Sequence, residues 1–73
     1  MSHSLHLLFS GHDFHVRLAA DAEPGEILAL CATAMRESRV VEFTDALPPG
    51  ATRRSTVLVN FTHVGGVWIE TET

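Results

Sequence analysis

A chain of 73 residues with 45% hydrophobic and 19% charged residues has the composition of a globular protein, and residues 1–73 have room for one domain. Nine acidic residues against five arginines, with no lysine, give a net charge of −4. This charge disfavours nucleic-acid binding, because phosphate-binding surfaces are basic. No apolar run approaches the roughly 20 residues of a membrane span, and no basic residues precede the first apolar segment, which argues against a signal peptide.

The single cysteine, Cys31, rules out an internal disulfide, so we expect a cytoplasmic protein. A domain this small often needs a disulfide, a metal or a partner subunit to supplement its core. With disulfides and Cys-rich zinc sites excluded, oligomerisation is the expected supplement. The exclusive use of arginine over lysine, with many Ala and Val residues, is typical of a GC-rich bacterial or phage genome.

Polar residues 10–13 predict the turn of a β-hairpin in the first third of the chain. Gly11 stands at the first central position, which suits a type II′ two-residue turn and pairs Phe9 with Phe14. In that register the apolar residues collect on one face of the hairpin. This face holds Leu5, Leu7, Phe9, Phe14, Val16 and Leu18, and the opposite face holds His6, Leu8, His15 and Arg17.

An amphipathic helix is predicted over residues 24–38. Pro24 suits its first turn, where a missing N–H costs nothing. Acidic residues near the start and Arg36 and Arg39 near the end favour the helix dipole. The spacing of three and four residues predicts one apolar stripe, made of Ile27, Leu30, Cys31, Ala34 and Met35.

Three further strands are predicted over residues 40–44, 56–60 and 64–71, with an irregular connection over 45–55. Asn60 should open a tight turn by bonding the backbone two residues on. Gly65 and Gly66 predict a bulge in the last strand. The order is ββαβββ, and the fold class is α+β, with one helix on one face of a single, mainly antiparallel sheet.

The two-residue period of a strand sorts the side chains onto two faces. The face that the helix covers should hold Leu5, Leu7, Phe9, Phe14, Val16, Leu18, Val41, Phe43, Val57, Val59, Val67 and Ile69. The opposite face is mixed, and its apolar members could form an interface because Trp is enriched at binding hot spots. The candidate interface residues are Trp68, Leu8, Leu58, Val40 and Arg17. The alternative is that they are scattered singly among polar residues.

His6 and His15 are weak candidates for a metal site, since they share the mixed face. Zinc needs at least three protein ligands, and the possible third, Glu42 or Glu70, lies on a strand whose position the sequence does not define. The alternative is exposed histidines on a solvated face. We therefore predict no metal and no cofactor, and expect some pH sensitivity where His6 lies beside Arg17.

No catalytic residues are predicted. Cys31 lies on the apolar stripe, which indicates a buried, inert thiol rather than a nucleophile. Gly65 and Gly66 precede a strand rather than a helix, so they form no phosphate loop. Arg53 and Arg54 could contact a phosphate or an acidic partner, or could simply be a solvated loop tip.

The sequence thus favours a non-catalytic interaction module that forms a homodimer or binds another protein. The contact would use the sheet face opposite the helix or an open sheet edge. A histidine-dependent metal or small-ligand binder, with His6 and His15 at its centre, is the alternative. Nucleic-acid binding through Arg53 and Arg54 is a third, disfavoured hypothesis.

Overall fold

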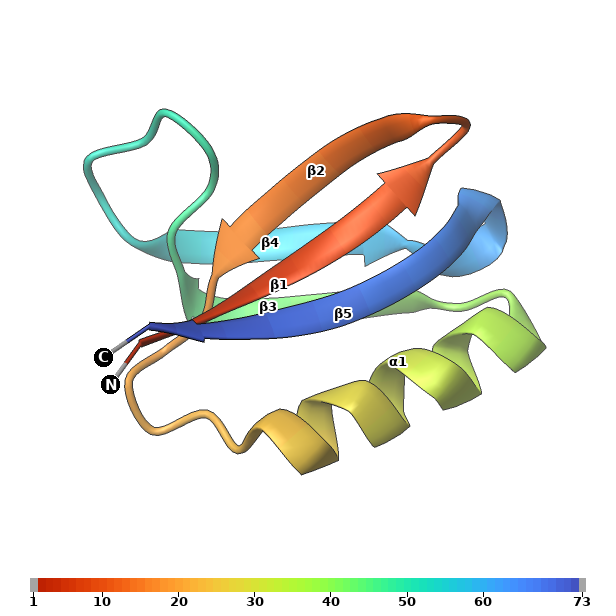
Figure 1. Ribbon diagram of the computed structural model, residues 1–73, viewed down its shortest axis with the longest axis horizontal. Helices are drawn as coiled ribbons and strands as arrows, with labels where there is room; N and C mark the ends of the chain where they lie inside the picture. The colour runs from red at the N-terminus through yellow and green to blue at the C-terminus, as the bar shows by residue number, and fades with distance from the viewer. Residues whose placement is uncertain (1, 73) are drawn as a thin grey trace.

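The computed structural model describes residues 2–72, and their elements follow the predicted ββαβββ order (Figure 1). The strands are β1 (Ser2–Phe9), β2 (His12–Arg17), β3 (Val40–Ala46), β4 (Ser55–Asn60) and β5 (Val64–Glu72). The helix α1 (Pro24–Glu37) follows the hairpin, and a 3₁₀ turn, η1 (Phe61–His63), precedes β5. The predicted α+β class, with one helix packed against antiparallel strands, is confirmed.

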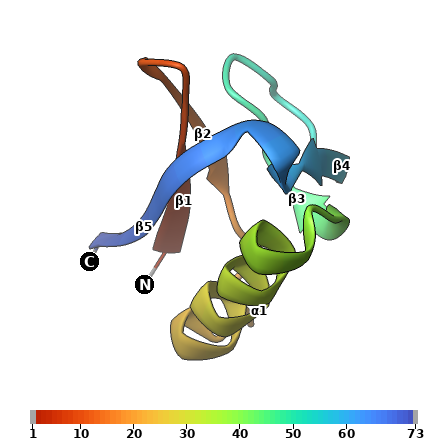
Figure 2. The same ribbon diagram turned by 90° about the vertical axis from the view of Figure 1, so that its right-hand side faces the viewer.

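The strands form two sheets rather than the single sheet predicted. One has the order β2-β1-β5 and the other pairs β3 with β4, all antiparallel. The sheets meet at one isolated bridge, in which Arg17 and Leu47 exchange backbone hydrogen bonds of 3.0 and 2.9 Å. Figure 2 shows the sheets as separate layers, with α1 below them. Residue periodicity predicts which face a side chain occupies, but not which strands become neighbours.

The hairpin forms, but its predicted turn and register are wrong. Ser10 and Gly11 are the turn residues, with φ values of 45° and 87°, so Phe9 pairs with His12 and Leu7 with Phe14. Two positive φ values match a type I′ turn, whose twist suits a hairpin better than the alternatives. The error shifts the pairing by two residues, and a shift of two leaves every side chain on its predicted face.

The helix begins and ends through local backbone contacts. The Glu23 side chain accepts a hydrogen bond from the Gly25 N–H at 3.2 Å, and Ser38 ends the helix with φ of 53°. The predicted end is therefore one residue late. Leu30, expected in the buried stripe, is 45% exposed, because the other stripe residues already fill the contact with the sheets.

The core lies between the two sheets and α1. Every residue predicted for the covered face is buried or packed against the buried cluster. Phe61 also belongs to the core, with a side chain only 1% exposed, although the sequence pattern did not predict its burial. The predicted turn is confirmed, since Asn60 Oδ1 accepts from Thr62 N at 3.0 Å, and this turn places the Phe61 ring inside. Phe61 therefore anchors the connection between the two sheets.

The predicted glycine bulge is also confirmed. Leu8 pairs with Gly66 while the next residue, Phe9, pairs with Val64, so Gly65 is the extra residue. β3 runs two residues further than predicted, through Asp45 with φ of 52°, and Ala46 is fully buried. Within residues 2–72, no helix has the length and apolar character that a membrane crossing requires.

Candidate interaction surfaces

The five predicted interface residues do not form one patch. Trp68, Leu8 and Arg17 lie on the outer face of the β2-β1-β5 sheet. Val40 and Leu58 lie on the outer face of the β3-β4 sheet. We call the first the ring face; it carries Ser4, His6, Leu8, Asp13, His15, Arg17, Trp68, Glu70 and Glu72. We call the second the aliphatic face; it carries Val40, Glu42, Thr56, Leu58 and Asn60.

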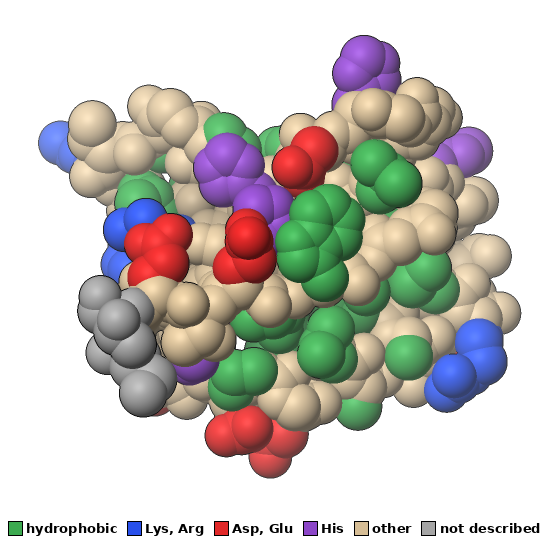
Figure 3. All heavy atoms as spheres, in the orientation of Figure 1, with side chains coloured by type: hydrophobic (Ala, Val, Ile, Leu, Met, Phe, Trp, Pro, Cys, Tyr) green, Lys and Arg blue, Asp and Glu red, His purple; other side chains and the backbone are tan. Residues whose placement is uncertain are grey.

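Three rings form a row across the ring face. His6 on β1 pairs directly with His15 on β2 and with Trp68 on β5. The His6 and His15 ring centroids are 5.5 Å apart at 26°, and those of His6 and Trp68 are 5.0 Å apart at 13°. Figure 3 shows the histidine, acidic and hydrophobic side chains gathered over these strands. Cross-strand aromatic pairs of this kind stabilise a sheet and fix ring orientation.

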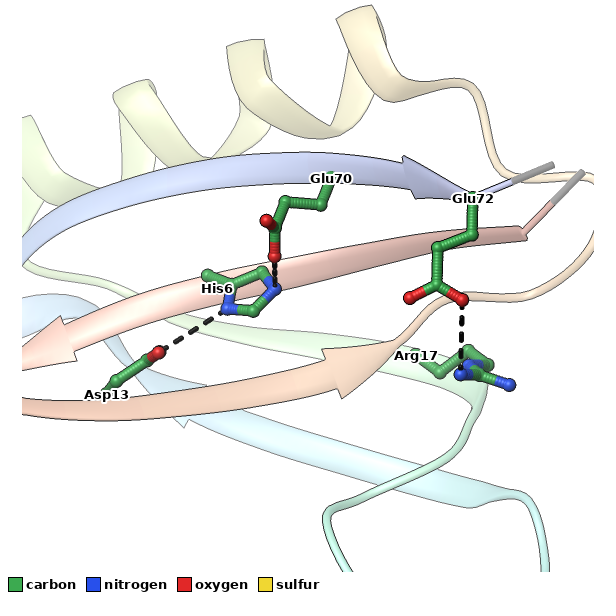
Figure 4. Close-up of polar contacts among 5 residues, drawn as sticks. All are labelled: His6, Asp13, Arg17, Glu70 and Glu72. Carbon is green, nitrogen blue, oxygen red and sulfur yellow. Dashed lines mark ion pairs between the residues drawn. The ribbon is translucent and has the colours of Figure 1, made fainter.

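Two carboxylates flank the central ring (Figure 4). Glu70 Oε2 lies 2.5 Å from His6 Nε2, and Asp13 Oδ1 lies 3.5 Å from His6 Nδ1. The His6 side chain is only 13% exposed, and its Nδ1 has no hydrogen-bond partner within residues 2–72. Arg17 was expected beside His6, but it lies opposite Ser4 and 3.8 Å from Glu72. The two-residue register error accounts for this difference.

The geometry gives His6 and His15 no shared metal position. Stacked rings point their nitrogen lone pairs along parallel planes, so the lone pairs do not converge on one ion. Of the two possible third ligands, Glu70 lies at His6 and Glu42 lies on the other sheet. No group of three or more His, Cys, Asp or Glu side chains within residues 2–72 is placed to hold a metal. The row of rings is therefore suited to stacking and hydrogen bonding.

The aliphatic face is exposed and nearly free of charge. Val40 is 59% exposed and Leu58 is 66% exposed, and they stand diagonally across the β3-β4 pair. Glu42 is the one charged residue among the described positions of this face. A groove of about 530 Å³ beside it is lined by Leu30, Val40 and Val41, together with Ala34 and the polar or charged residues Thr33, Arg39 and Glu42. Leu30 thus extends the apolar surface onto α1.

The remaining candidates have structural roles. Burial raises the pKa of the Cys31 thiol to about 11, so the reactive thiolate is disfavoured at neutral pH. The guanidinium of Arg54 donates to the carbonyls of Leu18 and Asp45 at 3.2 and 2.8 Å. It therefore holds the β3–β4 loop in place, whereas Arg53, which is equally exposed, makes no such hydrogen bond within residues 2–72. No signal in the sequence distinguishes the two arginines.

These surfaces define a small α+β domain with two exposed faces of unlike chemistry. Comparison with protein-family models, with curated proteins and with solved structures gave no significant match. The loop between β3 and β4 lines a groove with Ser4, His15 and Arg17, which covers one end of the ring face. The end with Trp68 and Glu70 stays open. Any function must therefore be argued from the two faces themselves.

Proposed function

We propose that the protein is a non-catalytic interaction module that self-associates as a symmetric dimer through its aliphatic face. The observation that carries this proposal is the exposure of Val40 and Leu58, which exceeds that of every other exposed large hydrophobic residue in the described chain. Both side chains lie on the same face of one sheet, and Leu30 lines a groove together with Val40. Burying such a patch against a second copy removes apolar surface from water.

The β3-β4 sheet also benefits from a second layer. A two-stranded sheet is marginally stable alone, and here the core covers only its inner face. β4 carries no charged residue and no proline, the features that usually protect a strand against association. A copy packed on the outer face would cover both β3 and β4. This arrangement supplements a core that is small for the chain length.

Charge supports the aliphatic face over the ring face as the site of self-association. A symmetric dimer brings the same patch of both copies together, so the charges of the patch face charges of the same sign across the interface. The aliphatic face contributes one carboxylate, that of Glu42. The ring face contributes an excess of carboxylates, which would repel across the same axis.

A single buried cysteine fits a reducing compartment, and on that basis we propose that the protein is cytoplasmic.

Sedimentation velocity of the full chain tests the dimer. Wild-type protein should sediment as a dimer at micromolar concentration, and Leu58→Lys should sediment as a folded monomer because a charge replaces the exposed leucine. Leu28→Lys, which places the same charge at an exposed leucine of α1, serves as the matched control and should remain dimeric. A monomeric wild-type protein, or equal dissociation by both variants, would contradict the proposal.

A further inference from the structure

The ring face presents an indole with one side free. Trp68 stacks on His6 through one side of its ring system. β5 is an edge strand of its sheet in the described part of the chain, so no strand follows on the other side of the indole. Trp68 is 40% exposed. A free aromatic face of this kind attracts a cation, because the π system is negative above and below the ring.

The face that carries this indole also carries three carboxylates. Glu70 follows Trp68 on the same side of β5, and Asp13 lies across the sheet on β2. Both carboxyl side chains are more than half exposed, and each directs one oxygen at His6. Glu72 adds a third carboxylate, with Arg17 beside it. With both histidines neutral, the described residues of the face therefore carry two net negative charges.

We propose that the ring face binds a basic, arginine-bearing segment of a partner protein. A guanidinium would stack on the free side of Trp68 and donate hydrogen bonds to Glu70. The guanidinium group suits both contacts, because it is planar, always charged and forms paired hydrogen bonds with carboxylates. Nucleic acids and anionic membranes are repelled by the same charge, and a second copy of this face would be repelled as well.

The site is already organised for this partner. His6 holds the Glu70 carboxylate next to the indole, through the contact between Nε2 and Oε2. Binding would therefore cost less side-chain ordering than at an unrestrained surface glutamate. The free edge of β5 lies beside Trp68. An extended segment paired with that edge would place alternate side chains next to Trp68 and Glu70.

A peptide titration followed by intrinsic fluorescence tests the proposal, because Trp68 is the single tryptophan of the chain. The probe is a capped peptide with three arginines at alternate positions, and the control peptide has glutamines in their place. The arginine peptide should change the emission saturably, with a dissociation constant that rises with salt. The glutamine peptide should leave the emission unchanged. An arginine peptide without saturable effect at millimolar concentration would overturn the proposal.

Variants that each remove one carboxylate test whether the peptide binds at the ring face or responds only to the net negative charge of the protein. Glu70→Gln should weaken binding about two- to fivefold, and Asp13→Asn should weaken it by a similar or smaller factor. Glu26→Gln removes the same charge from an exposed position of α1, away from both faces, and should leave the dissociation constant unchanged. Equal losses in Glu70→Gln and Glu26→Gln would show that the peptide responds only to net charge, and would refute the site.

The indole contact needs a readout other than fluorescence. Trp68→Leu should weaken binding of the arginine peptide about two- to fivefold in calorimetry, since it removes the cation–π contact and keeps an apolar side chain. The same variant should leave the oligomeric state unchanged in sedimentation. Unchanged affinity of Trp68→Leu would refute the stacking. Loss of a dimer in Trp68→Leu would instead identify the ring face as a contact between copies and overturn the proposal.

Discussion

The ring face and the aliphatic face lie on different sheets of one small domain, and they hold their exposed side chains in opposite ways. On the ring face, His6 stacks on Trp68 and contacts Glu70, so the aromatic and acidic groups restrain one another. On the aliphatic face, Val40 and Leu58 stand exposed, and Glu42, which pairs with Leu58, is the one charged residue. The first face offers oriented charge and a flat ring, and the second offers exposed aliphatic side chains with a single charge.

The difference indicates which partner each face can accept. An almost uncharged apolar face can meet its own copy, because symmetry then opposes apolar groups to apolar groups. A face with excess carboxylates repels its copy and selects a cation. The two faces need not compete, since they lie on separate sheets joined at one bridge. A dimer through one face would leave two copies of the other available, which raises the avidity for a partner with repeated basic segments.

Removing the Phe61 ring should have the largest effect, because this side chain anchors the turn between β4 and β5 and so supports both faces. Phe61→Ala should lower the free energy of unfolding by about 3–5 kcal/mol, as measured by urea denaturation. Phe14→Ala, at a half-buried ring of the hairpin, should cost clearly less. If Phe61→Ala does not fold, Phe61→Leu provides a milder comparison. Similar losses at Phe61 and Phe14 would contradict the anchoring role.

The burial of Cys31 in the core that both faces share can be tested by measuring stability as a function of pH. Burial raises the pKa of this thiol from 9.0 to about 11, so the unfolded chain loses the proton at a lower pH than the folded chain. The stability that results is fully present below pH 9.0 and is lost as pH rises toward about 11. The loss should be on the order of 2–3 kcal/mol in urea denaturation.

A loss of stability in this pH range can be assigned to Cys31 alone among the side chains. The chain contains no tyrosine and no lysine, so no other side chain has an ordinary pKa in this range. Cys31→Ala is the control, and its stability should stay nearly constant over the same interval. A wild-type curve that matches the Cys31→Ala curve would show that the thiol is solvated, and hence that the core beneath the faces is open.

The sequence predicted the faces of side chains better than the neighbours of strands. The alternation of apolar and polar residues correctly placed Leu5 and Leu7 on the opposite face from His6. A register error of two residues does not change the face on which a side chain lies, because successive side chains alternate between faces. The same error hid the direct pairing of His6 with His15. It arose because Ser10 adopts a positive φ that is uncommon for a residue other than glycine.

The division into two sheets was beyond the reach of periodicity. Trp68 and Leu58 share the same outward phase in their strands, so the sequence analysis placed them on one face. They are separated because β5 pairs with β1 and β4 pairs with β3, and this choice of neighbours is a tertiary feature. The contact between His6 and Glu70 likewise depends on β5 pairing with β1, across most of the chain length.

The smallest predicted effect concerns the joint between the two sheets, where neighbouring arginines provide an internal comparison. Arg54 donates to the carbonyls of Leu18 and Asp45, next to the Arg17–Leu47 bridge. Arg54→Ala should therefore lower the free energy of unfolding by about 1–2 kcal/mol. It should also speed hydrogen exchange at the Arg17 and Leu47 amides, because those bonds link the sheets.

Arg53→Ala removes the same charge from an exposed position and should change stability by less than about 0.5 kcal/mol. Faster exchange at the bridge in Arg54→Ala, with unchanged exchange at the pairing of β3 with β4, would show that the Arg54 hydrogen bonds stabilise the joint and not the β3-β4 sheet itself. Equal effects of the two arginine variants would mean that the loop is held by charge alone, and that the faces are independent of its hydrogen bonds.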